Sequence, residues 1–255
     1  MKFTDGYWQD RPRAHVLRAR QVRSITAEDG RMTVLAPTAV VRGRGDTLNR
    51  PALTVTYTSP APGVIGVRVE HHVGRPSAGP SFALASAPDH VADVVVDEAA
   101  GFLTSGDLSV RVPFGDTWEA EFRSGGRLLT ASRAKAVGAV TTDDGGEFVH
   151  EQLSLAVDEH VYGLGERFTP FVRNGQVVDV WNADGGTSSE QAYKNVPFHL
   201  SDGGTASSST TPSTSPSRSP RRSSRGRRCP CPARCCSTTS STARRRRTCS
   251  PATRP

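Results

Sequence analysis

Cysteine is absent from the first 202 residues of this chain, and large apolar side chains are absent from residues 203–255. Without cysteine, no disulfide framework supports the long first part. No stretch approaches the roughly 18 consecutive apolar residues that a membrane-spanning helix needs. The N-terminal letters MKFTDGYWQDRPR lack the apolar region and the cleavage site of a signal peptide. These absences predict a soluble, cytoplasmic protein with no membrane partner.

Charge is also unevenly spread, because residues 203–255 contain no Asp, Glu or Lys and consist only of Gly, Thr, Ala, Ser, Pro, Arg and Cys. Twelve of the 32 basic residues are arginines of this segment, and all 25 acidic residues precede it. The formal charge of +7 therefore averages a basic tail with a first part that carries 20 basic and 25 acidic side chains. A mildly acidic first part has no electrostatic footprint for nucleic acid, so no nucleic-acid partner is expected.

Short, β-branched apolar runs separated by turn residues dominate residues 1–160. Leu53, Val55 and Tyr57 alternate with threonines, as in a strand with one buried face. The run at 59–63, SPAPG, is expected to end that strand. Further strands are expected at 65–69, 94–96, 102–105, 108–112, 118–122 and 127–129. No amphipathic helix of three turns is visible, so the pattern predicts an all-β antiparallel sandwich.

Residues 162–200, YGLGERFTPFVRNGQVVDVWNADGGTSSEQAYKNVPFHL, combine many turn residues with many aromatic residues. Gly, Asn and Asp favour tight turns, and aromatic side chains supply flat apolar faces. On a β-scaffold, such a loop commonly contacts a ligand. In the alternative interpretation, Trp181 and Phe168 are core residues and the glycines only form turns.

Few side chains in the first part suggest catalysis or metal binding. His71 and His72 are neighbours on an expected strand, so they point to opposite faces and do not chelate one ion easily. His150 and His160 are isolated, which is typical of polar surface or hydrogen-bonded interior histidines. Glu166 and Arg167 could form a catalytic pair, but an adjacent Glu-Arg pair in a turn is more often structural. No metal and no cofactor are expected.

Four stretches resemble segments of one known family: MKFTDGYW at 1–8, GVIGVRVEH at 63–71, HVYGLGERFTPFVRNGQ at 160–176 and WNADGGTSSEQAYKNVPF at 181–198. The family they resemble is glycoside hydrolase family 31, and within it the bacterial α-xylosidases. The resemblance implies that residues 1–202 form the N-terminal, galactose-mutarotase-like β-sandwich of this family. It also implies that the catalytic (β/α)8 barrel on which the sandwich packs is absent here, so no catalytic residue can be assigned.

The family chemistry implied is the retaining hydrolysis of terminal α-xylosides, with two barrel aspartates as nucleophile and general acid/base. The family's sandwich contributes one loop to the active site, at an Asn-Arg-Asp motif. This chain has Asn182-Ala183-Asp184 there, so the resemblance implies that Asp184 binds substrate on the aglycone side. Ala183 departs from the motif, and a loop-capping role for Asp184 is the alternative. The implied partner is a carbohydrate, and a homo-oligomer is left open for the full-length form.

Residues 203–255 read as a disordered, low-complexity tail. Cys229, Cys231, Cys235 and Cys236 suggest zinc, but the tail has no histidine and no CxxC pair. The run at 244–247, RRRR, could bind nucleic acid without sequence preference.

A shifted reading frame explains this composition better, because Ser, Thr, Pro, Arg, Ala, Gly and Cys are what a GC-rich gene yields out of frame. If each codon begins one base inside an original codon, residues 205–220 are compatible with YGVFVNDPEHVSFEVA. Residues 231–243 are compatible with VPGEVLQYYVIDG, and residues 244–253 with PTPKDVLSRY. The hypothesis is a single-base deletion, or an equivalent change, near Gly203 and Gly204. It predicts an incomplete, poorly soluble sandwich without α-xylosidase activity.

Three functions are therefore ranked. The first is an N-terminal fragment of an α-xylosidase, a glycosidase that is inactive as this chain stands. The second is a stand-alone carbohydrate-binding β-module, which needs a closed sandwich. The third is a nucleic-acid-binding protein with a basic tail, which requires a genuine reading frame for that tail and salt-dependent binding.

Overall fold

The structure is a computed structural model that describes residues 4–5, 9–71, 86–87, 89–180, 192–209, 231–232 and 237–242. Within these ranges the regular structure consists of β-strands and one short 3-10 helix, η1 (Arg44–Thr47). All strand pairs are antiparallel. The expected all-β class is confirmed.

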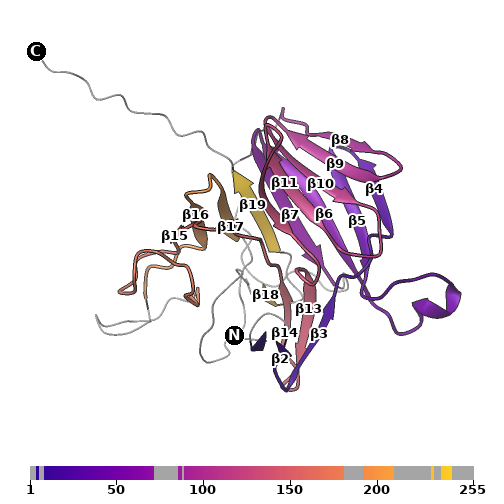
Figure 1. Cartoon of the computed structure of the whole chain (residues 1–255), viewed down its shortest axis with the longest axis horizontal. Coiled ribbons are helices and arrows are strands. Elements are labelled where there is room, and N and C mark those ends of the chain that lie inside the picture. Colours follow the sequence, from indigo (N-terminus) through magenta and orange to yellow (C-terminus); the bar gives the residue numbers. More distant parts are fainter. Residues whose placement is uncertain are drawn as a thin grey trace, which may run out of the picture.

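The largest sheet has eight strands, and its two ends are formed by different parts of the sequence. The strands are, in spatial order, β15 (Val161–Gly163), β16 (Phe198–Ser201), β17 (Ala206–Ser209), β19 (Ser237–Thr242), β7 (Val64–Glu70), β6 (Ala52–Ala61), β5 (Arg31–Pro37) and β4 (Ser24–Glu28). Figure 1 shows β15, β16 and β17 at one end, away from β4 and β5. The last part of the described chain thus extends a sheet begun by the first part.

Three smaller sheets complete the described part. The five-stranded sheet has the order β12 (Arg127–Ser132), β11 (Ala120–Ser124), β10 (Leu108–Pro113), β9 (Ala100–Ser105) and β8 (Asp93–Val96). The four-stranded sheet has the order β18 (Cys231–Pro232), β14 (Glu147–His150), β13 (Gly138–Thr142) and β3 (Ala14–Arg18). A short pair joins β1 (Thr4–Asp5) to β2 (Gln9–Asp10).

The core lies between the eight-stranded and five-stranded sheets. Tyr57 of β6 and Phe122 of β11 meet across it, with ring centroids 6.4 Å apart. Met32, Leu103 and Trp118 are among the largest fully buried side chains. The Trp118 indole N–H donates to Ser132 Oγ over 3.0 Å, so the one polar atom of this side chain keeps a partner inside the core.

The alternation of apolar residues predicted β6 and β7 correctly. In β6, every second residue from Leu53 through Val55 to Tyr57 is buried, so these three side chains share one face. The expected break at 59–63 is wrong in position. β6 continues to Ala61 with a register shift after Thr58, because an irregularity in the ladder accommodates proline, which has no N–H to donate. The turn itself is at Gly63, whose φ is +72°.

Candidate functional site

Two chain segments meet beside β15 and flank residues 181–191. We call residues 161–180 the first arm and residues 192–201 the second arm. β15 of the first arm pairs with β16 of the second, with Tyr162 opposite Leu200. Beyond the strands, the N–H of Leu164 donates to Phe198 O over 2.8 Å, and the N–H of Glu166 donates to Lys194 O over 3.1 Å. The arms therefore stay paired beyond β15 and β16, as far as Glu166 and Lys194.

The turn Gly163-Leu164-Gly165 makes this close pairing of the arms possible. All three residues have positive φ, of 105°, 70° and 88°. A Cβ at Gly165 would lie 2.2 Å from Lys194 O, and one at Gly163 would lie 2.7 Å from Phe198 O. Glycine is required at both positions, since these neighbours are backbone atoms and L-residues rarely adopt such angles. The sequence interpretation of these glycines as turn residues is confirmed, with the added role of close approach.

Arg173 fixes the internal shape of the first arm. Its side chain is buried and donates to the carbonyl oxygens of Gly163 (3.0 Å) and Pro170 (2.7 Å), and to Thr169 Oγ1 (2.6 Å). Burial lowers the pKa of Arg173 from its usual value. Asn174 adds a bridge to the strand end, because its side-chain oxygen accepts from the Val161 N–H over 2.8 Å. The Arg173-Asn174-Gly175 segment is thus the hydrogen-bonding centre of this arm.

Arg167 connects the two arms directly. Its guanidinium donates to Leu164 O (3.1 Å) and Asp179 O (2.8 Å) on the first arm, and to Asn195 Oδ1 on the second. Asn195 in turn donates to Ala192 O over 2.7 Å. Burial is the main cause that lowers the pKa of Arg167, followed by the nearby charge of Arg173. Arg167 therefore holds residues that lie on both sides of 181–191.

Glu166 and Arg167 do not form the pair that their adjacency in the sequence suggested. Glu166 instead accepts from the Lys194 ammonium over 2.6 Å, in an ion pair whose two side chains are about two-thirds exposed. The hydrogen bond and charge of Glu166 raise the pKa of Lys194. An exposed pair of this kind contributes little stability, and its geometry favours the structural interpretation over a catalytic one.

Large apolar side chains are exposed on both arms. They are Phe168, Phe171, Val177, Val180, Tyr193, Val196, Phe198 and Leu200. Phe171 packs on Tyr162 with ring centroids 5.2 Å apart, yet it stays 76% exposed. Phe168 is 62% exposed, so its interpretation as a core residue is wrong. We call this set the apolar surface of the arms.

Asn182, Ala183 and Asp184, together with Trp181, lie outside the described residues. The structure therefore leaves the substrate contact of Asp184 as a prediction. Sequence reasoning missed Arg167 and Arg173 as the residues that organise the flanking arms. Their type gave a signal, since an arginine among turn residues has enough donors to satisfy several loop carbonyls.

The remaining candidate histidines have structural surroundings. His160 pairs with Asp202: its backbone N–H donates to Asp202 Oδ1 (2.8 Å), and its Nδ1 lies 3.0 Å from Oδ2. The backbone hydrogen bond is the main cause that lowers the pKa of Asp202. His150 is buried on β14, His71 follows β7, and His72 lies outside the described ranges. Among residues of known placement, no three His, Cys, Asp or Glu side chains gather as a metal site requires.

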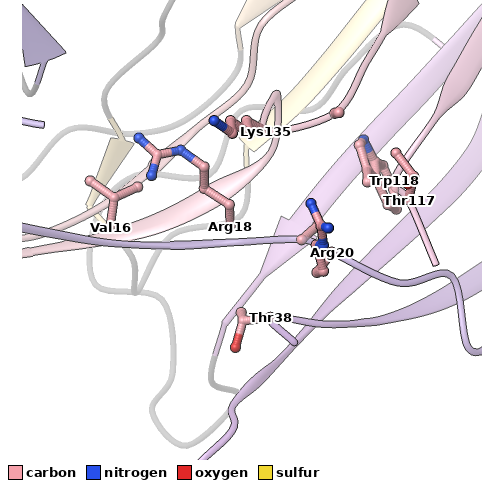
Figure 2. Close-up of a pocket in the computed structure, with 9 residues that line it drawn as sticks. Val16, Arg18, Arg20, Thr38, Thr117, Trp118 and Lys135 are labelled. Carbon is pink, nitrogen blue, oxygen red and sulfur yellow. The ribbon is translucent and has the colours of Figure 1, made fainter. Parts of the chain in front are cut away.

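A separate pocket of about 220 Å³ lies where β3 meets the turns before β11 and after β12. Figure 2 shows Arg18, Arg20 and Lys135 around it, with Trp118 at one side. Arg18 is already paired with Asp10, over 2.9 Å from Nη1 to Oδ2. The lining holds cations but no carboxylate, so it does not suit glycoside hydrolysis, which uses a pair of carboxyl groups.

No helix in the described part of the chain is long and apolar enough to cross a membrane.

Comparisons with known proteins agree with one another. The model of the glycosyl hydrolase 31 N-terminal galactose mutarotase-like domain matches residues 54–209. The α-xylosidase XylQ of Lactiplantibacillus pentosus is 44% identical over 205 residues, which are 80% of this chain and 27% of that protein. An α-xylosidase of Emericella nidulans is 36% identical over 225 residues, with 80% of this chain and 29% of that protein covered. The chain thus spans less than a third of these relatives.

Solved structures share the fold at low identity. A family 31 dextranase of Flavobacterium johnsoniae, complexed with glucose, has a TM-score of 0.65 at 14% identity, covering 89% of this chain and 26% of that one. A family 31 α-xylosidase from a soil metagenome, complexed with xylose, has a TM-score of 0.58 at 13% identity. It covers 87% of this chain and 32% of that one. At such identities the likeness concerns the fold alone.

Proposed function

This chain belongs to glycosyl hydrolase family 31, as its N-terminal galactose mutarotase-like domain, and from that premise we propose that it is part of an α-xylosidase. The reaction is the retaining hydrolysis of terminal α-xylosides. The observation that carries the proposal is the identity of 44% and 36% with two α-xylosidases, one bacterial and one fungal, over four-fifths of this chain. The two catalytic aspartates belong to the barrel in this family, so no residue of this chain is assigned to bond cleavage.

The domain's own contribution is one wall of the aglycone site. In this proposal the carboxylate of Asp184 accepts hydrogen bonds from sugar hydroxyls, which are good partners for a charged acceptor. Support comes from the paired arms, because Arg167 and the Gly163-Leu164-Gly165 turn hold the residues on both sides of 181–191. The apolar surface of the arms is proposed as the contact with the catalytic barrel.

A domain exchange tests the proposal. Residues 1–202 of this chain replace the corresponding domain of the L. pentosus relative, and the chimera is assayed on an aryl α-xyloside and on an aryl α-glucoside. We expect hydrolysis of the xyloside, and an Asp184→Ala version with a raised KM. The control chimera carries the matching domain of the Emericella nidulans relative. An active control beside an inactive, folded test chimera would refute the proposal.

The carbohydrate-binding alternative gains one observation, since Phe168, Phe171 and Tyr193 are exposed on the arms. It predicts that the 255-residue chain alone binds xylo-oligosaccharides, measured by calorimetry. The α-xylosidase proposal expects neither such binding nor turnover from this chain alone. Cytoplasmic location and a homo-oligomeric full-length form also stay proposals, to be tested by cell fractionation and by sedimentation of the full-length form.

A further inference from the structure

The eight-stranded sheet has a continuous apolar face across four neighbouring strands. Its buried members on β4, β5, β6 and β7 are Ile25, Met32, Val34, Ala36, Leu53, Val55, Tyr57, Ile65, Val67 and Val69. Directly paired residues share a face of the sheet, so pairs such as Val55 with Val69 and Tyr57 with Val67 form apolar rows across the strands. These rows pack against the five-stranded sheet and contribute ten residues to the core.

The residues in these rows change from apolar to polar at the next two strands, β19 and β17. β19, yellow in Figure 1, pairs with β7 so that Thr239 is opposite Val67 and Ser241 is opposite Ile65. On its other edge, β19 pairs with β17, and Ser241 is opposite Ser207. Ser207 itself is only 5% exposed. Positions in register with the apolar rows are therefore occupied by serine and threonine alone.

This occupation conflicts with the place of the two strands in the sheet. A strand with one face on a core normally alternates apolar and polar residues. The buried Ser207 of β17 adds little apolar burial, and its hydroxyl needs a hydrogen-bond partner. β17 and β19 carry the composition of an exposed linker at an interior position of the sheet, between β16 and β7. Agreement between sequence and position, which characterises natural folds, fails at these two strands.

The neighbouring reading frame removes the conflict at four of the five positions in register with the apolar rows. In codons that begin one base earlier, the letters TASSS at 205–209 are compatible with YGVFV, and CSTTSS at 236–241 are compatible with LQYYVI. Five positions are in register with the apolar rows, and four of them become apolar: Ser207→Val, Ser209→Val, Thr239→Tyr and Ser241→Ile. The fifth, Ser237 opposite Val69, becomes Gln and stays polar. The four apolar changes would continue the rows, and both strands would gain the β-branched or aromatic residues typical of strands.

We infer that the chain from about residue 205 is translated one base out of frame, and that β17 and β19 are positions of strands whose in-frame side chains complete the core. The match to the family domain extends to Ser209, which is past the change in composition and through β17. The family fold thus continues beyond the point at which the residue types cease to support it. This inference concerns folding and does not depend on the α-xylosidase activity proposed above.

The gene sequence is the first test. Around the codons for residues 202–205, adding one base is expected to open a frame that encodes patterned strands at 205–209 and 236–241. A gene in which no frame downstream of Gly204 encodes such strands overturns the inference. The chain with the corrected frame and the 255-residue chain with its present tail are then expressed under the same conditions. The chain with the corrected frame is expected to be several-fold more soluble and to bind less of a hydrophobic dye. Equal solubility and dye binding would contradict the completed core.

A pair of matched variants tests the register without changing the frame. The first carries Ser207→Val, Ser209→Val, Thr239→Tyr and Ser241→Ile in the 255-residue chain. The control carries the same four new residues one position earlier, as Ala206→Val, Ser208→Val, Thr238→Tyr and Ser240→Ile. Added hydrophobicity is equal, but a shift of one residue moves every side chain to the other face. The urea midpoint should rise in the first variant alone, and equal midpoints in both variants would overturn the register.

Discussion

Replacing Arg167 by methionine should loosen the junction between the two arms. The guanidinium donates to Leu164 O and Asp179 O on the first arm and to Asn195 on the second. Methionine keeps a long unbranched side chain but has no donor. The substitution therefore removes the link between the residues on either side of 181–191 while preserving most of the apolar contact.

The magnitude follows from the number and type of these hydrogen bonds. A bond that involves a charged group contributes about 1.5–3 kcal/mol, and the substitution removes at least the three named above. Arg167 is only half-buried, so water replaces part of what is removed, and we expect about 3 kcal/mol rather than the full sum. Since about 1.4 kcal/mol corresponds to a factor of ten, the arms should open on the order of a hundredfold more often.

Hydrogen exchange at two amides measures this opening. The N–H groups of Leu164 and Glu166 donate across the junction, so their exchange reports separation of the arms. Glu166→Gln is the control, because it weakens only the exposed pair with Lys194 and should change exchange little. Arg167→Lys should resemble methionine, since an ammonium cannot replace the planar fork. Unchanged exchange at both amides in Arg167→Met would refute the reasoning.

Three further outcomes follow from other contacts. Gly165→Ala should lower the free energy of unfolding by at least about 2 kcal/mol, read from the urea midpoint, because its φ is +88° and the new Cβ would meet Lys194 O at 2.2 Å. Trp118→Phe should cost about 1–3 kcal/mol, seen as a lower Tm, since the buried Ser132 hydroxyl loses its donor. Asp202→Asn should make the free energy of unfolding depend less on pH under acidic conditions. The pKa of Asp202 is lowered by folding, so its contribution is present above the unfolded value near 3.8 and is lost as pH falls through the lower folded value. Urea midpoints at pH 5 and pH 3 should therefore differ less in the variant than in the parent.

Alternation of apolar residues predicted the centre of the fold well. Four strands were predicted because each has one buried face, so that apolar and polar residues alternate along the sequence. They are β6, β7, β9 and β10. β5 was not identified, although Met32, Val34 and Ala36 alternate in the same way. Its signal is weaker because Leu35, on the opposite face, is also apolar and blurs the period.

The arms could be predicted only in part. Glycines at 163, 165 and 175 indicated turns, and all three have positive φ. Most partners of Arg167 and Arg173 could not be predicted, since most of the acceptors are backbone carbonyls, which every residue possesses. The Glu166–Lys194 pair was also missed, because the two residues are 28 positions apart and become neighbours only through the pairing of β15 with β16.

The order of strands in the large sheet also has a consequence during synthesis. β7 pairs on one edge with β6, its neighbour in sequence, but on the other edge with β19, where Val69 meets Ser237. At about 5–20 residues per second, β7 leaves the ribosome roughly 10 to 30 s before its second partner exists. Throughout that interval a strand with three buried apolar residues presents an unpaired edge. Nascent chains of this protein therefore expose their central strand while translation continues, and a chaperone that binds extended apolar segments would find its target at residues 64–70.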